Sequence, residues 1–281
     1  MLTRQLVYGP AGAGKSHYAN SSWWNPVTKE RIDGREGIWI TFGGEDNVTL
    51  GIPEKNRKRF TSASLNDKDW LKNFKALGLG LQAAYAKTGE AAVFSVIIDG
   101  FSEFDILFKQ ITENMEEEEI KKNQFHVWRE LLAEFYSALL MFQPDRTGAH
   151  LITTARRGEV KKYVQRSAGN PKMGGKTWTV EEDEWFNGAE AAPSLHGGFK
   201  KDLPHYFDFV LYLDTITITA PAGHPRAGQR IPVHEMETMR GGDVYVKNIA
   251  EQGWLQSSHP TQLINTNFDE FMGIVHEVSG V

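Results

Sequence analysis

Apolar runs alternate with amphipathic stretches along the first half of the chain, and this alternation predicts strands and helices that take turns. Short apolar runs typical of buried parallel strands cover residues 2–8, 37–42, 93–99 and 149–155. Apolar side chains recur at helical spacings of three and four in residues 67–87 and 116–142. Shorter helices are expected at residues 15–21, 103–110 and 266–278.

Strand-like runs follow one another in the second half, at residues 206–213, 215–219, 231–239 and 243–247, with no helical pattern between them. The sequence therefore predicts an α/β fold with a mainly parallel sheet flanked by helices and with antiparallel strands near the C-terminus. Residues 1–254 are expected to form one core, and residues 255–281 an extension with a helix. Residues 156–190 are polar and glycine-rich, and a long loop is expected there.

The first predicted strand runs directly into a glycine-rich motif, G-x-x-x-x-G-K-S, known as Walker A. Small residues let backbone N–H groups curl around a triphosphate, the lysine reaches the β- and γ-phosphates, and the serine hydroxyl ligates Mg²⁺. We therefore expect ATP and Mg²⁺ to bind here. The expected nucleotide-binding residues are Gly9, Pro10, Ala11, Gly12, Ala13, Gly14, Lys15, Ser16 and His17.

Polar residues at the ends of the other predicted strands are the next candidates, because the carboxyl ends of parallel strands meet in one crevice. Asp99 closes an apolar run in the pattern called Walker B and is expected to hold Mg²⁺ together with Ser16. Glu45 and Glu103 are both candidates for the base that positions water for hydrolysis. Thr154 ends the next strand, where a polar side chain is able to sense the γ-phosphate.

The chain as a whole is acidic, but it contains one basic stretch. The chain has 31 basic and 36 acidic residues, no cysteine and a formal net charge of −5. Disulfides and thiolate metal sites are thereby excluded, and the apolar runs are too short to span a bilayer, so a soluble intracellular protein is expected. The basic stretch, opposed only by Glu159, is expected to contact DNA. Its cations are Arg156, Arg157, Lys161, Lys162, Arg166, Lys172 and Lys176.

Several segments together resemble RecA-type ATPases, and in particular phage-encoded AAA/RecA-like proteins of single-strand annealing or recombination. Residues 40–45 are similar to the strand of that group that ends in the catalytic glutamate. Residues 97–104 resemble its Walker B segment, residues 151–156 its sensor strand, and residues 193–210 the stretch before its fifth core strand. The resemblance covers about residues 2–250 and leaves residues 255–281 unplaced.

The resemblance implies a RecA-like P-loop NTPase core that hydrolyses ATP and acts on single-stranded DNA in phage recombination or replication. It favours Glu45 as the catalytic base and Thr154 as the sensor, and it places a DNA-binding loop after Arg156. Relatives carry a Lys-x-Arg that reaches into the neighbour's ATP; here Lys247 is present without the arginine, and Arg240 is a substitute. The implied partners are further copies of the chain in a ring or filament and a phage single-strand-binding protein, in the host cytoplasm.

Two other functions fit the same motif. In a P-loop kinase of a small molecule, the stretch from Arg156 to Lys176 would be a mobile lid over the acceptor. In a nucleotide-binding scaffold without significant hydrolysis, the incomplete Lys-x-Arg would need no replacement. ATPase activity with and without single-stranded DNA distinguishes the three.

Overall fold

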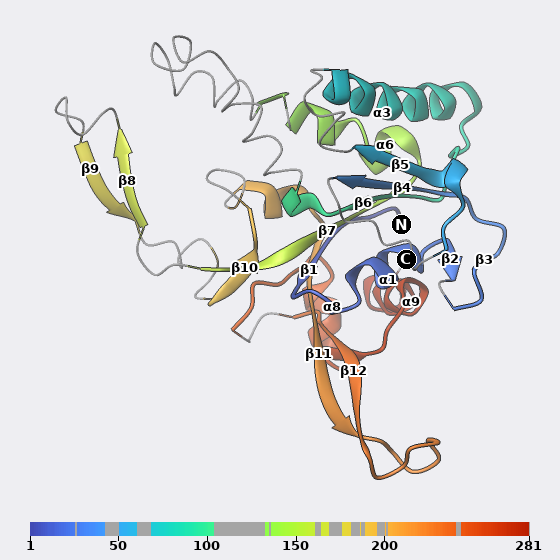
Figure 1. The fold of residues 1–281 in the computed structure, drawn as a ribbon, viewed down its shortest axis with the longest axis vertical. Helices are drawn as coiled ribbons and strands as arrows, with labels where there is room; N and C mark the ends of the chain where they lie inside the picture. The colour runs from blue at the N-terminus through green and yellow to red at the C-terminus, as the bar shows by residue number, and fades with distance from the viewer. Residues whose placement is uncertain are drawn as a thin grey trace.

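The computed structural model describes residues 1–25, 27–42, 51–60, 69–103, 133–134, 136–160, 164–168, 176–180, 186, 189–195, 200, 202–239 and 243–280. They form an α/β fold around one large, mostly parallel sheet (Figure 1). In the part described, no helix is both long and apolar enough to cross a membrane.

Six parallel strands make up the main part of the sheet, in the order β11-β1-β7-β6-β4-β5. Their bounds are β1 Arg4–Gly9, β4 Gly37–Phe42, β5 Arg57–Phe60, β6 Ser95–Asp99, β7 His150–Glu159 and β11 Phe209–Thr219. Antiparallel pairing begins at β11, with β12 (Arg230–Glu237) followed by β14 (Gln262–Ile264). The short strands β10 (Ala191–Pro193) and β13 (Lys247–Asn248) pair antiparallel with β7 and β11. The expected parallel core with late antiparallel strands is confirmed.

Helices cover both faces of this sheet (Figure 1). On one face, α3 (Asp69–Thr88) and α6 (Pro144–Thr147) lie over a cluster of buried side chains that includes Trp70 and Phe74. On the other face lie α1 (Lys15–Asn20), α8 (Glu251–Gln256) and α9 (Phe268–Ser279), which bury Tyr18, Trp254 and Phe271 in a second cluster. Short 3-10 turns occur at η2 (Glu54–Asn56) and η5 (Leu203–Tyr206).

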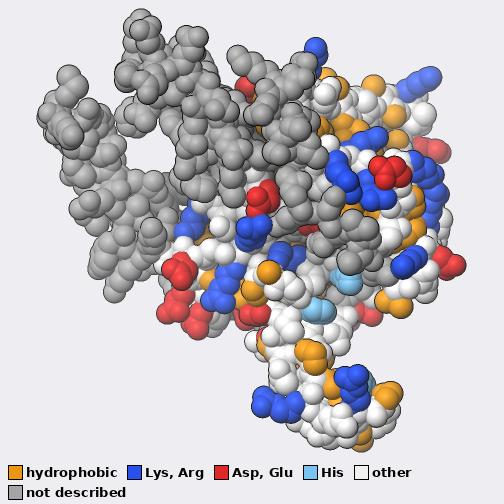
Figure 2. Space-filling model, in the orientation of Figure 1, with side chains coloured by type: hydrophobic (Ala, Val, Ile, Leu, Met, Phe, Trp, Pro, Cys, Tyr) orange, Lys and Arg blue, Asp and Glu red, His pale blue; other side chains and the backbone are white. Residues whose placement is uncertain are grey.

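Strand β11 is a single strand where two were expected. Its first half, up to Tyr212, pairs with β1 inside the sheet, and its second half pairs with β12 alone. The result is a two-stranded ribbon that projects from the body (Figure 1). Residues 215–233 contain Arg226 and Arg230 and no acidic residue, both arginines are exposed, and cationic side chains gather at the free end of the ribbon (Figure 2).

The prediction of one long loop over residues 156–190 was wrong. Strand β7 continues to Glu159, and β8 (Val164–Ala168) pairs antiparallel with β9 (Lys176–Val180) in a hairpin away from the main sheet. These strands contain few large apolar residues, so they carry no core pattern. A further hairpin, β2 (Trp24–Asn25) with β3 (Glu30–Arg31), occupies the expected connection after α1.

Two expected helices lie mostly outside the described residues. Residues 101–103 are helical, as are 133–134 and 136–140 of the expected long helix. The helix after β5 is α3, and it continues through Gly78 and Gly80 without a break.

The C-terminal segment packs onto the same sheet as the N-terminal strand. Strand β14 pairs with β12, and α9 begins with a capping box in which Asn267 and Glu270 satisfy each other's backbone N–H groups. The ring of His150, the first residue of β7, lies 5.1 Å from that of Phe268 on α9, and its Nδ1 accepts the Thr3 N–H at 3.2 Å. Residues from the beginning, middle and end of the chain thus share one core.

Candidate functional site: the glycine-rich loop beside Asp99

The loop between β1 and α1 depends on its glycines. A Cβ on Gly9 would lie 1.9 Å from the backbone oxygen of Leu213 on β11, so only glycine fits there. Gly12 and Gly14 have φ of 79° and 85°, in the left-handed region that disfavours other residues. Lys15 Nζ donates to the carbonyl oxygens of Gly9 at 3.0 Å and Pro10 at 2.7 Å. The loop therefore curls around the lysine ammonium.

Asp99, at the end of β6, lies next to this loop and is 2% exposed. Three side chains donate hydrogen bonds to its carboxylate. Ser16 Oγ reaches Oδ1 at 3.1 Å, Thr154 Oγ1 reaches the same oxygen at 2.5 Å, and Trp39 Nε1 reaches Oδ2 at 3.1 Å. Thr154 also accepts the Gly100 N–H at 3.0 Å, which fixes the end of β6. Ser16, Asp99 and Thr154 thus meet, although Thr154 lies within β7, which continues to Glu159, and not at the end of a strand as expected.

The order of strands explains this meeting. Strand β7 lies between β1 and β6 in the sheet, so Thr154 on β7 is next to both the loop and Asp99. The hydroxyl of Ser16 and the carboxylate of Asp99 are oxygen donors of the kind that Mg²⁺ prefers, one or two at a time with water completing its shell. These residues fit a magnesium ion, which Ser16 and Asp99 would hold. The lysine and the narrow glycine backbone fit a polyphosphate.

The two candidate bases have different positions. Glu103 follows β6, is 19% exposed in its side chain and forms an ion pair with Arg156. The Arg156 backbone N–H donates to Ser102 Oγ at 2.9 Å, so the two segments are held together. Glu45 follows β4 and lies outside the described residues.

The candidate DNA-binding cations fall into three groups. Arg156 is paired with Glu103, as described above, and Arg157 donates to the Tyr212 hydroxyl at 3.1 Å. Arg166 and Lys176 lie on the facing strands β8 and β9. The remaining members lie outside the described residues: Lys161, Lys162 and Lys172.

Tyr212, which accepts the hydrogen bond from Arg157, also donates one. Its hydroxyl donates to Asp214 Oδ2 at 2.7 Å, and burial together with this carboxylate raises the pKa of Tyr212 to about 12. The phenol therefore stays protonated and links a cation of β7 to a carboxylate of β11.

Of the two residues expected to reach the ATP of a neighbouring subunit, the structure describes only one. Lys247 Nζ donates to the backbone oxygen of Phe207 at 2.6 Å in its own chain. Arg240 lies outside the described residues.

Sequence reasoning missed two side chains that contact the site. Trp39 binds the Asp99 carboxylate, and its place in an apolar strand gave no sign of a polar role. The His234 ring on β12 lies against Gly14, where an added Cβ would be 3.1 Å from ring atoms. No local motif marks this histidine; only the pairing of β12 with β11 brings it to the loop.

Comparison with models of known protein families found none that matches this chain, and no curated protein matches it either. The class therefore follows from the fold and the geometry above. The chain is an α/β protein with a mostly parallel mixed sheet flanked by helices, compatible with a Rossmann or P-loop-like fold.

Proposed function

We propose that this protein is a RecA-like ATPase that binds ATP with Mg²⁺ at residues 9–17 and hydrolyses it while acting on single-stranded DNA. The observation that carries the proposal is the meeting of Ser16 and Thr154 on the buried Asp99 carboxylate, beside a lysine held in a glycine-rich loop. A chance glycine-rich turn would not be expected to lie next to a buried carboxylate that accepts three hydrogen bonds and stands two strands away in the sheet.

Each residue has a distinct part in this proposal. Lys15 exchanges its carbonyl partners for the β- and γ-phosphates, and Ser16 and Asp99 hold the magnesium ion that neutralises phosphate charge. Trp39 fixes the second oxygen of Asp99, so the carboxylate keeps one orientation. Thr154 contacts both Asp99 and the backbone of Gly100, which suits a residue that transmits the state of the phosphates to β6 and β7.

Glu45 is the proposed base. Glu103, the other candidate, already forms an ion pair with Arg156 within its own chain. Glu45 follows β4, the strand next to β6 in the sheet. A carboxylate there would reach water at the same crevice as Asp99.

Single-stranded DNA is the proposed partner because two segments that project from the sheet contain basic residues in their sequences. The β8–β9 hairpin, which projects from the sheet in Figure 1, contains Arg166 and Lys176 in its sequence. The end of the β11–β12 ribbon, where Figure 2 shows cationic side chains, contains Arg226 and Arg230. The whole chain is acidic, so one subunit would bind DNA weakly. Assembly of several subunits along one strand would multiply such contacts.

The decisive experiment is an ATP titration of Lys15→Ala, with Lys72→Ala on the exposed side of α3 as the matched control. Loss of hydrogen bonds to a charged phosphate is expected to weaken ATP binding by about 10- to 150-fold. The control is expected to bind as the parent does. Equal affinity of parent and Lys15→Ala would refute nucleotide binding at this loop.

ATPase rates with and without single-stranded DNA then test the second half of the proposal. Stimulation by DNA supports it. If turnover requires a small phosphate acceptor, the protein is a kinase instead. If ATP binds but is not hydrolysed, the protein is a nucleotide-binding scaffold.

A further inference from the structure

A cavity of about 450 Å³ opens beside the last glycine of the loop. It lies between α1, the loop of the β2–β3 hairpin, the β11–β12 pair and the segment that leads from β14 into α9. The side chains that matter to its chemistry are His17, Ile32, Leu213, His234, Asn265 and Asp269. Its volume is in the range of small-molecule sites, about 300–1,000 Å³.

We infer that this cavity receives the base and ribose of the nucleotide, and that residues 265–270 form one wall of it. The inference rests on the proposed function, because it needs the phosphates at Lys15 and Ser16. It assigns a role in ligand binding to the C-terminal segment, for which the sequence offered none.

The position of the cavity relative to the loop is the first argument. Gly14 lines the cavity and is directly followed by Lys15 and Ser16, the proposed phosphate and magnesium ligands. When the phosphates of a nucleotide occupy the loop, its nucleoside must lie outside the loop, at one of the loop's two ends. The cavity at Gly14 and His17 provides space for the nucleoside directly next to the phosphates.

The chemistry of the walls fits a nucleoside and not a second anion. Two imidazoles, His17 and His234, offer flat faces for stacking, and Leu213 adds an apolar surface. Asp269 and Glu270 also line the cavity, and their carboxylates, although each already accepts one hydrogen bond, from Arg35 and from the Asn267 N–H, can accept further ones from ribose hydroxyls.

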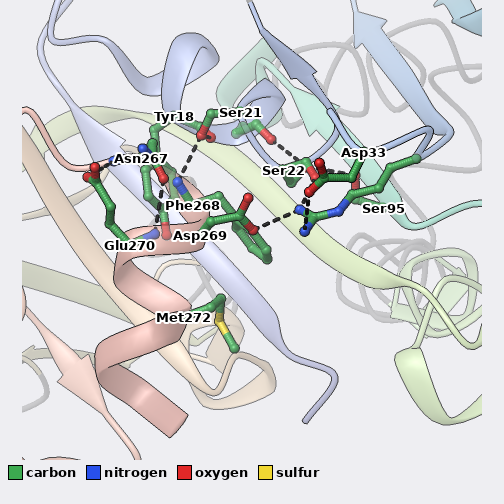
Figure 3. A network of polar contacts seen from close by, with 12 residues as sticks. Tyr18, Ser21, Ser22, Asp33, Ser95, Asn267, Phe268, Asp269, Glu270 and Met272 are labelled. Atoms are coloured by element: carbon green, nitrogen blue, oxygen red, sulfur yellow. Dashed lines mark hydrogen bonds and ion pairs between the residues drawn. The ribbon is translucent and has the colours of Figure 1, made fainter. Parts of the chain in front are cut away.

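The C-terminal wall is held firmly in place. Asn265 and His234 exchange two hydrogen bonds, from the Asn265 N–H to the His234 carbonyl at 2.7 Å and from the His234 N–H to Asn265 Oδ1 at 2.9 Å. The Phe268 N–H donates to Ser21 Oγ on the turn after α1 at 2.9 Å (Figure 3). Arg35 bonds Asp269 Oδ1 at 2.7 Å. The wall is therefore preorganised, which lowers the entropy cost of binding.

The test compares two ligands, Mg²⁺-ATP and Mg²⁺-tripolyphosphate, which share the phosphates and differ in the nucleoside. His234→Ala is expected to weaken ATP binding about tenfold through lost stacking and to leave tripolyphosphate within about twofold. His224→Ala, an exposed histidine near the far end of the same ribbon, is the matched control and is expected to change neither affinity.

An equal loss for both ligands, or no loss for either, would overturn the inference while leaving the proposed function intact. A parent protein that binds neither ligand would instead refute the proposed function.

Hydrogen exchange on the parent protein gives an answer that does not depend on a variant. Amides of residues 265–270 are expected to gain more protection with ATP than with tripolyphosphate. The same protection with both ligands would contradict the cavity assignment.

Discussion

His150 provides a quantitative test of the packing that unites the two ends of the chain. It is 6% exposed and lies between the rings of Phe94 and Phe268, at 5.0 and 5.1 Å. Burial, with the N-terminal amine and Arg35 nearby, lowers the pKa of His150 to about 4. The proposed change is His150→Asn, whose side-chain oxygen can still accept the Thr3 N–H but does not titrate.

The sign follows from proton linkage. An unfolded histidine has a pKa of about 6.5, so the unfolded chain binds a proton that the folded chain rejects. The stability due to neutral His150 is fully present above about pH 6.5 and is lost as the pH falls through the folded pKa. From a folded pKa of about 4, the loss is about 2 kcal/mol at pH 5 and about 3 kcal/mol at pH 4.

Urea unfolding, followed by tryptophan fluorescence, measures the free energy of unfolding at pH 7.5 and at pH 5. Between these values the parent is expected to lose about 2 kcal/mol more of its unfolding free energy than His150→Asn does. Ile152→Val, two residues further along β7, controls for lost packing and is expected to cost about 1 kcal/mol equally at both pH values. If parent and His150→Asn lose the same amount, His150 is not buried as a neutral group against α9.

Two predictions concern the proposed activity directly. Glu45→Gln is expected to keep ATP binding and to lower single-turnover hydrolysis by about 10²- to 10⁴-fold, because an amide cannot accept the proton; a larger effect of Glu103→Gln would reverse the assignment of the base. Neutralising Lys161, Lys162 and Arg166 together is expected to leave ATP affinity unchanged. It should make the slope of log K against log salt for a labelled single-stranded oligonucleotide shallower by about 0.7 per lost contact; fluorescence anisotropy that gives the parent slope would remove these residues from the interface.

The parallel core could be predicted because buried strands require continuous apolar runs. Residues 95–99 and 37–42 are buried almost throughout, and their sequences are correspondingly rich in apolar residues. Strand β5 could not be predicted in this way. It reads Arg57-Lys58-Arg59-Phe60, lies at the edge of the sheet and buries only Phe60, so the backbone pairing with β4 determines it. Edge strands and isolated hairpins lack the burial that leaves a pattern in sequence.

The candidate site shows the same division between local and long-range information. The loop glycines, Lys15, Ser16 and Asp99 belong to motifs whose chemistry requires these residue types at these places. Trp39 and His234 belong to no motif, and each reaches the site through strand pairing over a long sequence separation. Contacts of this kind follow from the order of strands, which a single sequence does not reveal.

That order also bears on how the proposed nucleotide site would work. Its phosphate end lies in the first turn after β1, at the centre of the sheet, and its nucleoside end is walled by a segment more than 200 residues later. The hydrogen bonds at Ser21 and Asn265 tie that wall to α1 and β12. A nucleotide in both places would contact the central strand, the base of the projecting ribbon and the C-terminal helix at once. Because ligands shift an equilibrium only through contacts that differ between two states, any response to the nucleotide would have to involve at least one of these three elements.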